Sequence, residues 1–216
     1  MQRLILDLVK YGNEEVLIIM THSLHRRGKK ADLREDYVIL AMLAKDFNEK
    51  FFDSRQRLIR VGEILNEYRP INIMKKELWK VSPVVTATYS DIKTVKRLIK
   101  TLKQEDLGIS IVVSGLLDEI QKMASKIKIN LHTVHFSLGV FGKKELLPHD
   151  EILEITTMCG HHCISPQSVE YYVKLIRNRK ISVQKAAKKL KKPCVCGIFN
   201  TSRAVHILNR IIKEHS

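Results

Sequence analysis

The chain has 216 residues, which is enough for one large domain or two small ones. Lys and Arg outnumber Asp and Glu by 38 to 23, and the formal net charge of +15 makes nucleic acid, an acidic protein or a phosphorylated ligand a plausible partner. No window approaches eighteen uninterrupted apolar residues, and the first residues already follow an amphipathic pattern. We therefore expect neither a membrane span nor a secretory signal, and a cytoplasmic location.

Residues 1–80 are predicted to form a helical section, either a separate domain or packed on a sheet. Asn13 followed by two glutamates is typical of a helix start, and Asp32 with Glu35 resembles a capping box for a second helix. Ser54 is the expected cap of a third helix that ends before Pro70. The apolar face of this third helix comprises Leu58, Val61, Ile64, Leu65 and Tyr68.

Residues 81–144 change to an alternation of strands and helices. Strands are predicted over 84–89, 109–113 and 131–141, with one helix starting at Asp91 and another over 116–127. The order βαβαβ favours parallel strands with right-handed crossovers, or a related α/β layer. Ligands gather at the carboxyl ends of such strands, which makes Tyr89, Ser90, Ser114 and Gly115 a candidate ligand rim.

Residues 145–216 are predicted to be a helical module. Ser165-Pro166, Ser182 and Asn200 are the expected helix starts. The whole chain is therefore predicted to be α/β or α+β: a helical section, a small βαβαβ layer and this helical module, which carries every cysteine of the chain.

The four cysteines form two close pairs within the last third of the chain. Cys159 and Cys163 have the spacing C-x3-C, and Cys194 and Cys196 have the spacing C-x-C, with thirty residues between the pairs. Cysteines paired in this way in a reducing compartment are more often metal ligands than disulfides. We therefore predict one metal centre that brings both pairs together.

A 4Fe-4S cluster is the favoured cofactor, with zinc as the alternative. Zinc ribbons usually have C-x2-C or C-x4-C pairs, whereas iron-sulfur ligand sets vary more in spacing, and two ligands separated by one residue reach adjacent corners of a cluster with less strain. A disulfide or a reactive thiol is the third interpretation. Glycines follow Cys159 and Cys196 and allow backbone amides to approach sulfur.

His161 and His162 stand between the first two cysteines. We expect them to donate hydrogen bonds to cluster sulfide or to line an entry path, without binding the metal themselves. Two alternatives stay open: one of them is a ligand, or one is the acid-base partner of an iron with an open coordination position.

The favoured function is a cytoplasmic iron-sulfur protein, redox-active or enzymatic, with a small-molecule or partner site near the cluster. An acidic protein or an electron-transfer partner is expected before nucleic acid. The alternative is a metal-stabilised nucleic-acid-binding or regulatory protein that uses the basic carboxy-terminal helices, since residues 171–192 hold nine basic side chains and no acidic one. A structural zinc protein with an unrelated activity is the third class. The sequence does not decide whether the protein is an enzyme.

Overall fold

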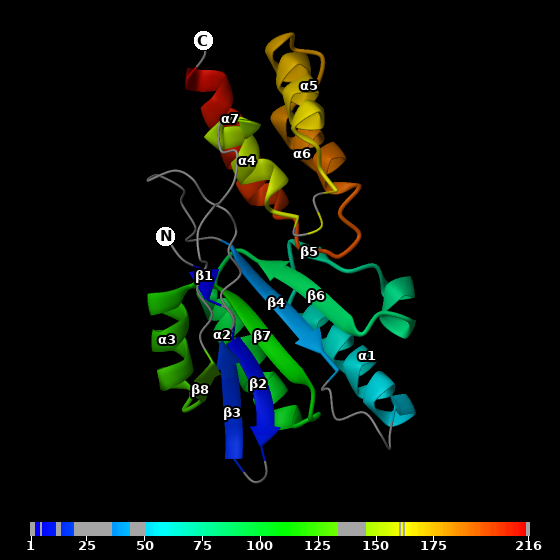
Figure 1. Ribbon diagram of the computed structural model, residues 1–216, viewed down its shortest axis with the longest axis vertical. Helices are drawn as coiled ribbons and strands as arrows, with labels where there is room; N and C mark the ends of the chain where they lie inside the picture. Colours follow the sequence, from blue (N-terminus) through cyan, green and yellow to red (C-terminus); the bar gives the residue numbers. More distant parts are fainter. Residues whose placement is uncertain are drawn as a thin grey trace.

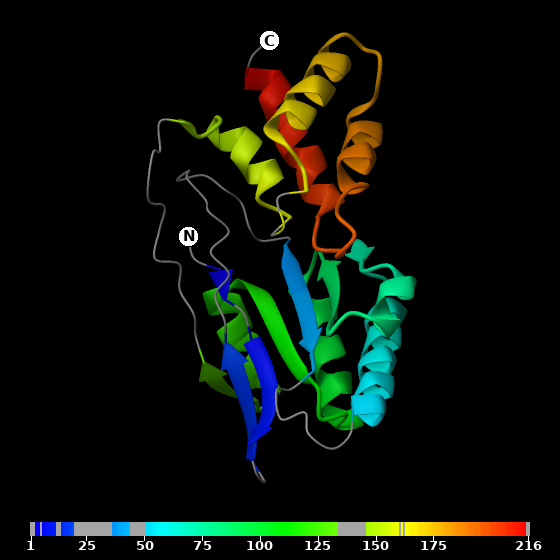
Figure 2. The same ribbon diagram turned by 45° about the vertical axis from the view of Figure 1, so that its right-hand side comes forward.

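The computed structural model describes residues 3–4, 6–11, 14–19, 36–43, 51–133, 146–159, 161 and 163–214. These residues form a mixed α/β fold, in which one sheet is packed against helices and a second group of helices lies beyond one end of the strands (Figures 1 and 2). The elements in chain order are β1 (Arg3–Leu4), β2 (Leu6–Tyr11), β3 (Glu14–Ile19), β4 (Tyr37–Met42), α1 (Phe51–Glu67), β5 (Asn72–Ile73), the 3-10 helix η1 (Lys76–Lys80), β6 (Val84–Tyr89), α2 (Ile92–Glu105), β7 (Ser110–Leu116), α3 (Leu117–Lys126), β8 (Asn130–Thr133), α4 (Asp150–Thr156), α5 (Pro166–Arg177), α6 (Val183–Lys191) and α7 (Thr201–Glu214).

The sheet has the strand order β5-β6-β4-β7-β2-β3-β8, and β1 also pairs with β7. Only β3 and β8 pair in parallel among these strands; the other pairings are antiparallel. The predicted strands β6, β7 and β8 do run in one direction, but they are not neighbours. Strand β4 lies between β6 and β7, and the pair β2 and β3 lies between β7 and β8, so amino-terminal strands separate the expected parallel ones.

The first two helices predicted for residues 1–80 are wrong where the structure describes them. Residues of the first form β3, and Tyr37 to Met42 of the second form β4. Strand β4 is central in the sheet and mostly buried, so its apolar residues form a continuous run without the alternation that marks a half-exposed strand. Such a run cannot be distinguished from a helix by periodicity alone. Asp36 and Leu43 border β4, and the other residues of both predicted helices lie outside the described part of the chain.

The third predicted helix is confirmed as α1, which starts three residues before Ser54. Its expected apolar face is buried: Leu58, Val61, Ile64 and Leu65 are each at most 1% exposed. Helices α1, α2 and α3 pack together and against the strands, so they form the main core with one face of the sheet (Figure 1).

The predicted elements of residues 81–133 are confirmed in order. The Asp91 carboxylate accepts a 2.8 Å hydrogen bond from the backbone amide of Thr94, which caps α2 as expected. Of the strand predicted over 131–141, the structure describes only the part that falls in β8. None of the helices in the described residues combines the length and the hydrophobicity that a membrane-spanning segment needs.

The carboxy-terminal helices also start where the sequence predicts. Ser165 caps α5 and Ser182 caps α6, and the side chain of Asn200 accepts a 3.0 Å hydrogen bond from the backbone amide of Arg203 in the first turn of α7. These helices pack into one module above the sheet (Figure 2). The cysteines lie at the helix ends that face the sheet.

A buried ionic network joins the helical module to the sheet. Arg203 of α7 donates to Asp36, the residue before β4, at 2.9 Å and to Glu154 of α4 at 3.3 Å. Glu154 also accepts a 2.6 Å hydrogen bond from Arg210, and Asn200 donates to Asp36 at 3.1 Å. Because buried charges are stable only when they are paired, this network fixes the position of α7 relative to β4.

Candidate metal centre

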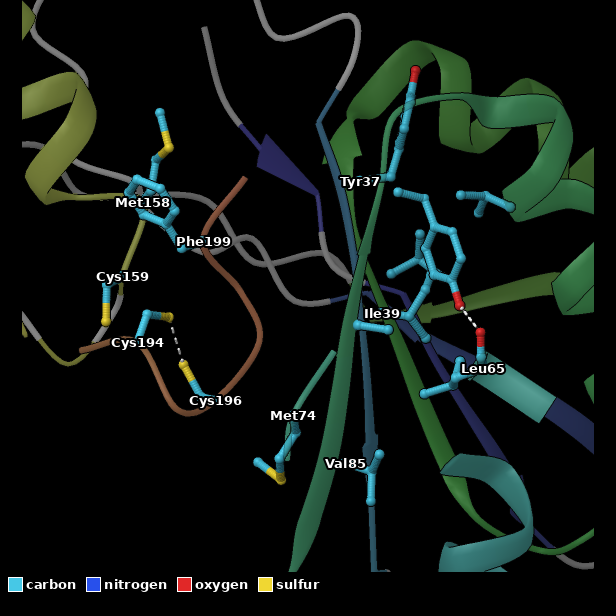
Figure 3. Packing of buried hydrophobic residues seen from close by; sticks show 14 of the residues in the cluster. Tyr37, Ile39, Leu65, Met74, Val85, Met158, Cys159, Cys194, Cys196 and Phe199 are labelled. Atoms are coloured by element: carbon cyan, nitrogen blue, oxygen red, sulfur yellow. Dashed lines mark hydrogen bonds between the residues drawn. The ribbon is translucent and has the colours of Figure 1, made fainter. Parts of the chain in front are cut away.

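Three of the four cysteine side chains converge at the junction of the sheet and the helical module. Cys159 follows α4, and Cys194 and Cys196 lie in the loop between α6 and α7; all three are buried. Figure 3 shows the sulfur atoms of Cys194 and Cys196 directed toward each other and Cys159 beside them, with Met158 and Phe199 above and Met74 below in that view. The Sγ atoms of Cys194 and Cys196 are 3.4 Å apart. The two sequence pairs therefore meet in space.

The fourth cysteine and one histidine complete the group on its outer side. Cys163 is exposed, and its Sγ atom lies 3.9 Å from the backbone oxygen of His161. Ligand atoms of Cys159, His161 and Cys196 all lie within 4.8 Å of one another, so these three residues alone can bind a metal ion. His161 is thus better placed as a ligand than the sequence indicated. His162 lies outside the described residues.

The loop that carries Cys194 and Cys196 is fixed against the edge of the sheet. The Thr86 hydroxyl donates to the backbone oxygen of Cys196, and the Thr88 hydroxyl donates to the oxygens of Gly197 at 2.9 Å and Ile198 at 3.0 Å. The amide of Asn72 donates to the oxygen of Phe199 at 3.1 Å. The position of Cys196 is therefore set by β5 and β6 rather than by the helical module alone.

Gly197 makes this close docking possible. Its φ of +76° lies in the left-handed region, and a Cβ atom added there would lie 2.2 Å from the backbone nitrogen of Met74 and 2.3 Å from the carbonyl carbon of Ile73. Only glycine satisfies both the turn and the contact. The glycine after Cys196, which the sequence associated with amide approach to sulfur, thus also lets the cysteine loop reach the sheet.

Backbone amides are directed at the cysteine sulfurs. The amides of His161 and Cys163 hydrogen bond to Cys159, and those of Ile198 and Phe199 hydrogen bond to Cys196 and Cys194. Hydrogen bonds from the other two buried thiols are the main cause that lowers the pKa of Cys159. In turn, donation to Cys159 raises the pKa of Cys194 and of Cys196. The three buried thiols therefore form one hydrogen-bonded group centred on Cys159.

Basic and apolar side chains border the centre. Lys191, at the end of α6, is close enough to Cys194 for their charges to interact; burial lowers its pKa and Cys194 opposes that shift. Lys192 and Pro193 are exposed, and Val195, between the two ligands, is 45% exposed. One exposed lysine and one exposed valine therefore flank the ligands of the α6–α7 loop.

The rim predicted at the strand ends is largely buried. Tyr89 is 2% exposed, and its hydroxyl donates to the backbone oxygen of Leu65 at 2.6 Å. Burial raises the pKa of Tyr89, which keeps its hydroxyl protonated. Ser114 and Gly115 are also buried, and only Ser90 is exposed. Tyr89 is therefore part of the hydrophobic core, and the Cys/His group is a stronger candidate for a functional site than this rim.

Sequence reasoning missed the residues that support the centre. Thr86, Thr88 and Asn72 contact the cysteine loop across 109 to 127 residues of sequence. One signal was present: the two threonines alternate with the apolar residues of β6, so they share the face opposite Val85 and Ala87. Buried threonines in a strand often mark a polar contact on that face.

Comparisons with protein-family models, with curated proteins and with solved structures found no match.

Proposed function

We propose that this is an iron-sulfur protein in which Cys159, Cys163, Cys194 and Cys196 hold a 4Fe-4S cluster that serves a redox or enzymatic reaction. The observation that carries the proposal is the convergence of the three buried thiols, with the exposed thiol of Cys163 beside Cys159. When bound, such a cluster supplies one-electron chemistry or a Lewis-acidic iron.

The surroundings of the thiols support a cluster at this place. Backbone amides hydrogen bond to the sulfurs, and the apolar side chains of Met158 and Phe199 bury them. Hydrogen bonding and burial are two of the features by which a protein tunes the reduction potential of a cluster. The fourth thiol, that of Cys163, opens one side of the centre to solvent. An opening of this kind suits electron exchange or ligand binding at the cluster.

Anaerobic purification followed by iron and acid-labile sulfide analysis tests the proposal. We expect iron and sulfide in equal amounts and broad visible absorbance from thiolate-ligated iron. Alanine substitution of Cys159 or Cys196 should abolish both, while the same substitution of the exposed His206 on α7 should leave them unchanged. One zinc per chain without sulfide would contradict the proposal.

Zinc is the second candidate, and the sulfur spacing favours it. A Zn–S bond of about 2.3 Å gives a distance of about 3.8 Å between two ligands of a tetrahedral site. The 3.4 Å between the Sγ atoms of Cys194 and Cys196 is close to that value. Cysteines that bind separate irons are farther apart, so cluster binding requires these two side chains to spread.

If the centre binds zinc, we propose a nucleic-acid-binding or regulatory role for the basic helices. Lysines 185, 188, 189 and 192 are exposed on or just after α6. However, nine residues separate α6 from α7, whereas the turn of a helix-turn-helix has three or four. Replacement of Lys188, Lys189 and Lys192 by alanine should make the slope of log DNA affinity against log salt concentration shallower by about one for each lost phosphate contact. An unchanged slope would exclude these lysines as the contact surface.

A further inference from the structure

We propose that one zinc ion is bound at the centre by three thiolates and one imidazole, those of Cys159, Cys194, Cys196 and His161. The Cys163 thiol stays free beside it. This inference rests on the second candidate of the proposed function, the zinc centre, and names its ligands. It differs from the cluster assignment in two ways, since it adds a histidine ligand and releases the exposed cysteine.

The first argument is the distance between the ligand atoms. The Sγ atoms of Cys194 and Cys196 are 3.4 Å apart. The ligand atoms of Cys159, His161 and Cys196 all lie within 4.8 Å of one another. With Zn–S bonds of about 2.3 Å and Zn–N bonds of about 2.0 Å, two ligand atoms of a tetrahedral site are about 3.5–3.8 Å apart. These atoms are therefore close to the spacing that one shared ion requires.

The second argument adds Cys194 to the three residues of that group. Its thiol is hydrogen bonded to Cys159 and lies beside Cys196, so it contacts two members of the group. None of these three cysteines is more than 6% exposed. The backbone amides of Ile198 and Phe199 hydrogen bond to Cys196 and Cys194, and such bonds orient and stabilise thiolate ligands.

The third argument separates Cys163 from the ligands. Cys163 is exposed, and its thiol donates to the backbone oxygen of His161 at 3.9 Å. Its Sγ atom also lies within hydrogen-bonding reach of Cys159. Among the described residues, however, the group of ligand atoms within 4.8 Å of one another leaves Cys163 out. Its backbone amide hydrogen bonds to the Cys159 sulfur, so Cys163 supports the centre through its backbone.

The order of the ligands in the sequence fits this assignment. His161 follows Cys159 by two positions, and Cys196 follows Cys194 by two, so the ion takes two ligands from each of two loops. Four protein ligands close a tetrahedral site, which is the arrangement of structural zinc. The ion joins the loop after α4 to the α6–α7 loop, which is itself fixed against the edge of the sheet.

Zinc affinity tests the ligand set, measured by competition with a chromophoric chelator after anaerobic purification. His161→Ala should bind zinc more than about tenfold more weakly than the wild type, because loss of a hydrogen-bond partner of a ligand alone lowers metal affinity by about 10- to 100-fold. Cys163→Ala and the control His206→Ala, exposed on α7, should stay within about twofold of the wild type, because neither removes a ligand.

Alkylation with iodoacetamide gives an independent readout. In the zinc-loaded wild type, mass spectrometry should find one adduct per chain, on Cys163, because the other three thiols are buried and bound. Zinc-loaded Cys163→Ala should give none.

The outcomes separate this inference from the two candidate functions. Zinc binding that depends on Cys163 and not on His161, with all four thiols protected from alkylation, would overturn this ligand set while the zinc centre stands. Iron and sulfide in the wild type would support the cluster and overturn this inference. One zinc per chain, a single adduct on Cys163 and weaker binding by His161→Ala would support the inference and refute the cluster.

Discussion

Substitution of Gly197 by alanine should detach the cysteine loop from the sheet. The added Cβ would meet the backbone of Met74 at 2.2 Å and of Ile73 at 2.3 Å, and backbone atoms of a paired strand cannot move aside as a flexible side chain can. The matched control is Gly108→Ala. Gly108 also has a positive φ, +62°, but its added Cβ would meet only the end of the Arg57 side chain, at 3.0 Å.

The two variants should differ by the contacts that the loop makes with β5 and β6. A left-handed conformation costs an L-residue about 1–2 kcal/mol, which both variants share. Gly197→Ala also loses hydrogen bonds from Thr86, Thr88 and Asn72, each worth about 1 kcal/mol, so it should be about 3 kcal/mol less stable than Gly108→Ala. Displacement of Cys196 should lower metal content as well.

Urea unfolding followed by tryptophan fluorescence suits this comparison, because the chain has a single tryptophan. Trp79 is 4% exposed, and its indole nitrogen donates to the backbone oxygen of Met74 at 3.0 Å, next to the Gly197 contact. Equal free energies of unfolding and equal metal content in the two variants would refute the inferred docking of the loop.

Three further predictions follow from the packing and the centre. Arg203→Met should lower the free energy of unfolding in urea by about 3–5 kcal/mol, because it leaves the Asp36 and Glu154 carboxylates buried without their shared partner. The control Arg60→Met removes only solvent-screened ion pairs and should lower it much less. Equal decreases in the two variants would contradict a stabilising role for the buried network. Partial burial opposes ionisation of Asp91, but hydrogen bonds from the first turn of α2 lower its pKa overall. The pKa of Asp91 is thus lower in the folded state than in the unfolded state, so Asp91→Ala should lower the free energy of unfolding by about 1 kcal/mol at neutral pH. The difference in free energy between wild type and variant should shrink as the pH falls below about 4, which unfolding measured at several pH values checks. A difference that does not change with pH would argue against an ionised cap. Removal of metal by a chelator should lower the thermal stability of the protein, since ligation and folding are coupled, and an unchanged melting temperature would show that the centre carries no folding energy.

Local signals in the sequence predicted the local structure well. The capping side chains of Asp91, Ser165 and Ser182 act within three residues, and each helix start that they predicted is present. The βαβαβ order was also recovered, because strands and helices there have distinct periods. These predictions needed no knowledge of which elements meet.

The errors have a shared cause in long-range pairing. Strand β4 is central in the sheet because β6 and β7 pair with its two edges, and neither neighbour is visible in its own residues. The dipeptide Gly12-Asn13, between the paired strands β2 and β3, is typical of a hairpin, but Asn13 followed by two glutamates also matches a helix start. The pairing of Arg203 with Asp36 spans 167 residues, so no local pattern could indicate it.

The candidate centre was predictable in composition but not in detail. Spacing identified the four cysteines as one group, and the structure brings Cys159, Cys194 and Cys196 together. The exposure of Cys163 and the approach of His161 depend on how the loop after α4 turns, which the sequence does not specify.

The thirty residues between Cys163 and Cys194 carry both α5 and α6. A cofactor bound by the two cysteine pairs would close this segment into a ring, and by the chain-entropy estimate a cross-link of that size removes about 3–4 kcal/mol of freedom from the unfolded chain. Occupancy of the centre and order in the lysine-rich helices would then be thermodynamically linked. Any partner that prefers the ordered helices would tighten cofactor binding by the same factor by which the cofactor tightens the partner.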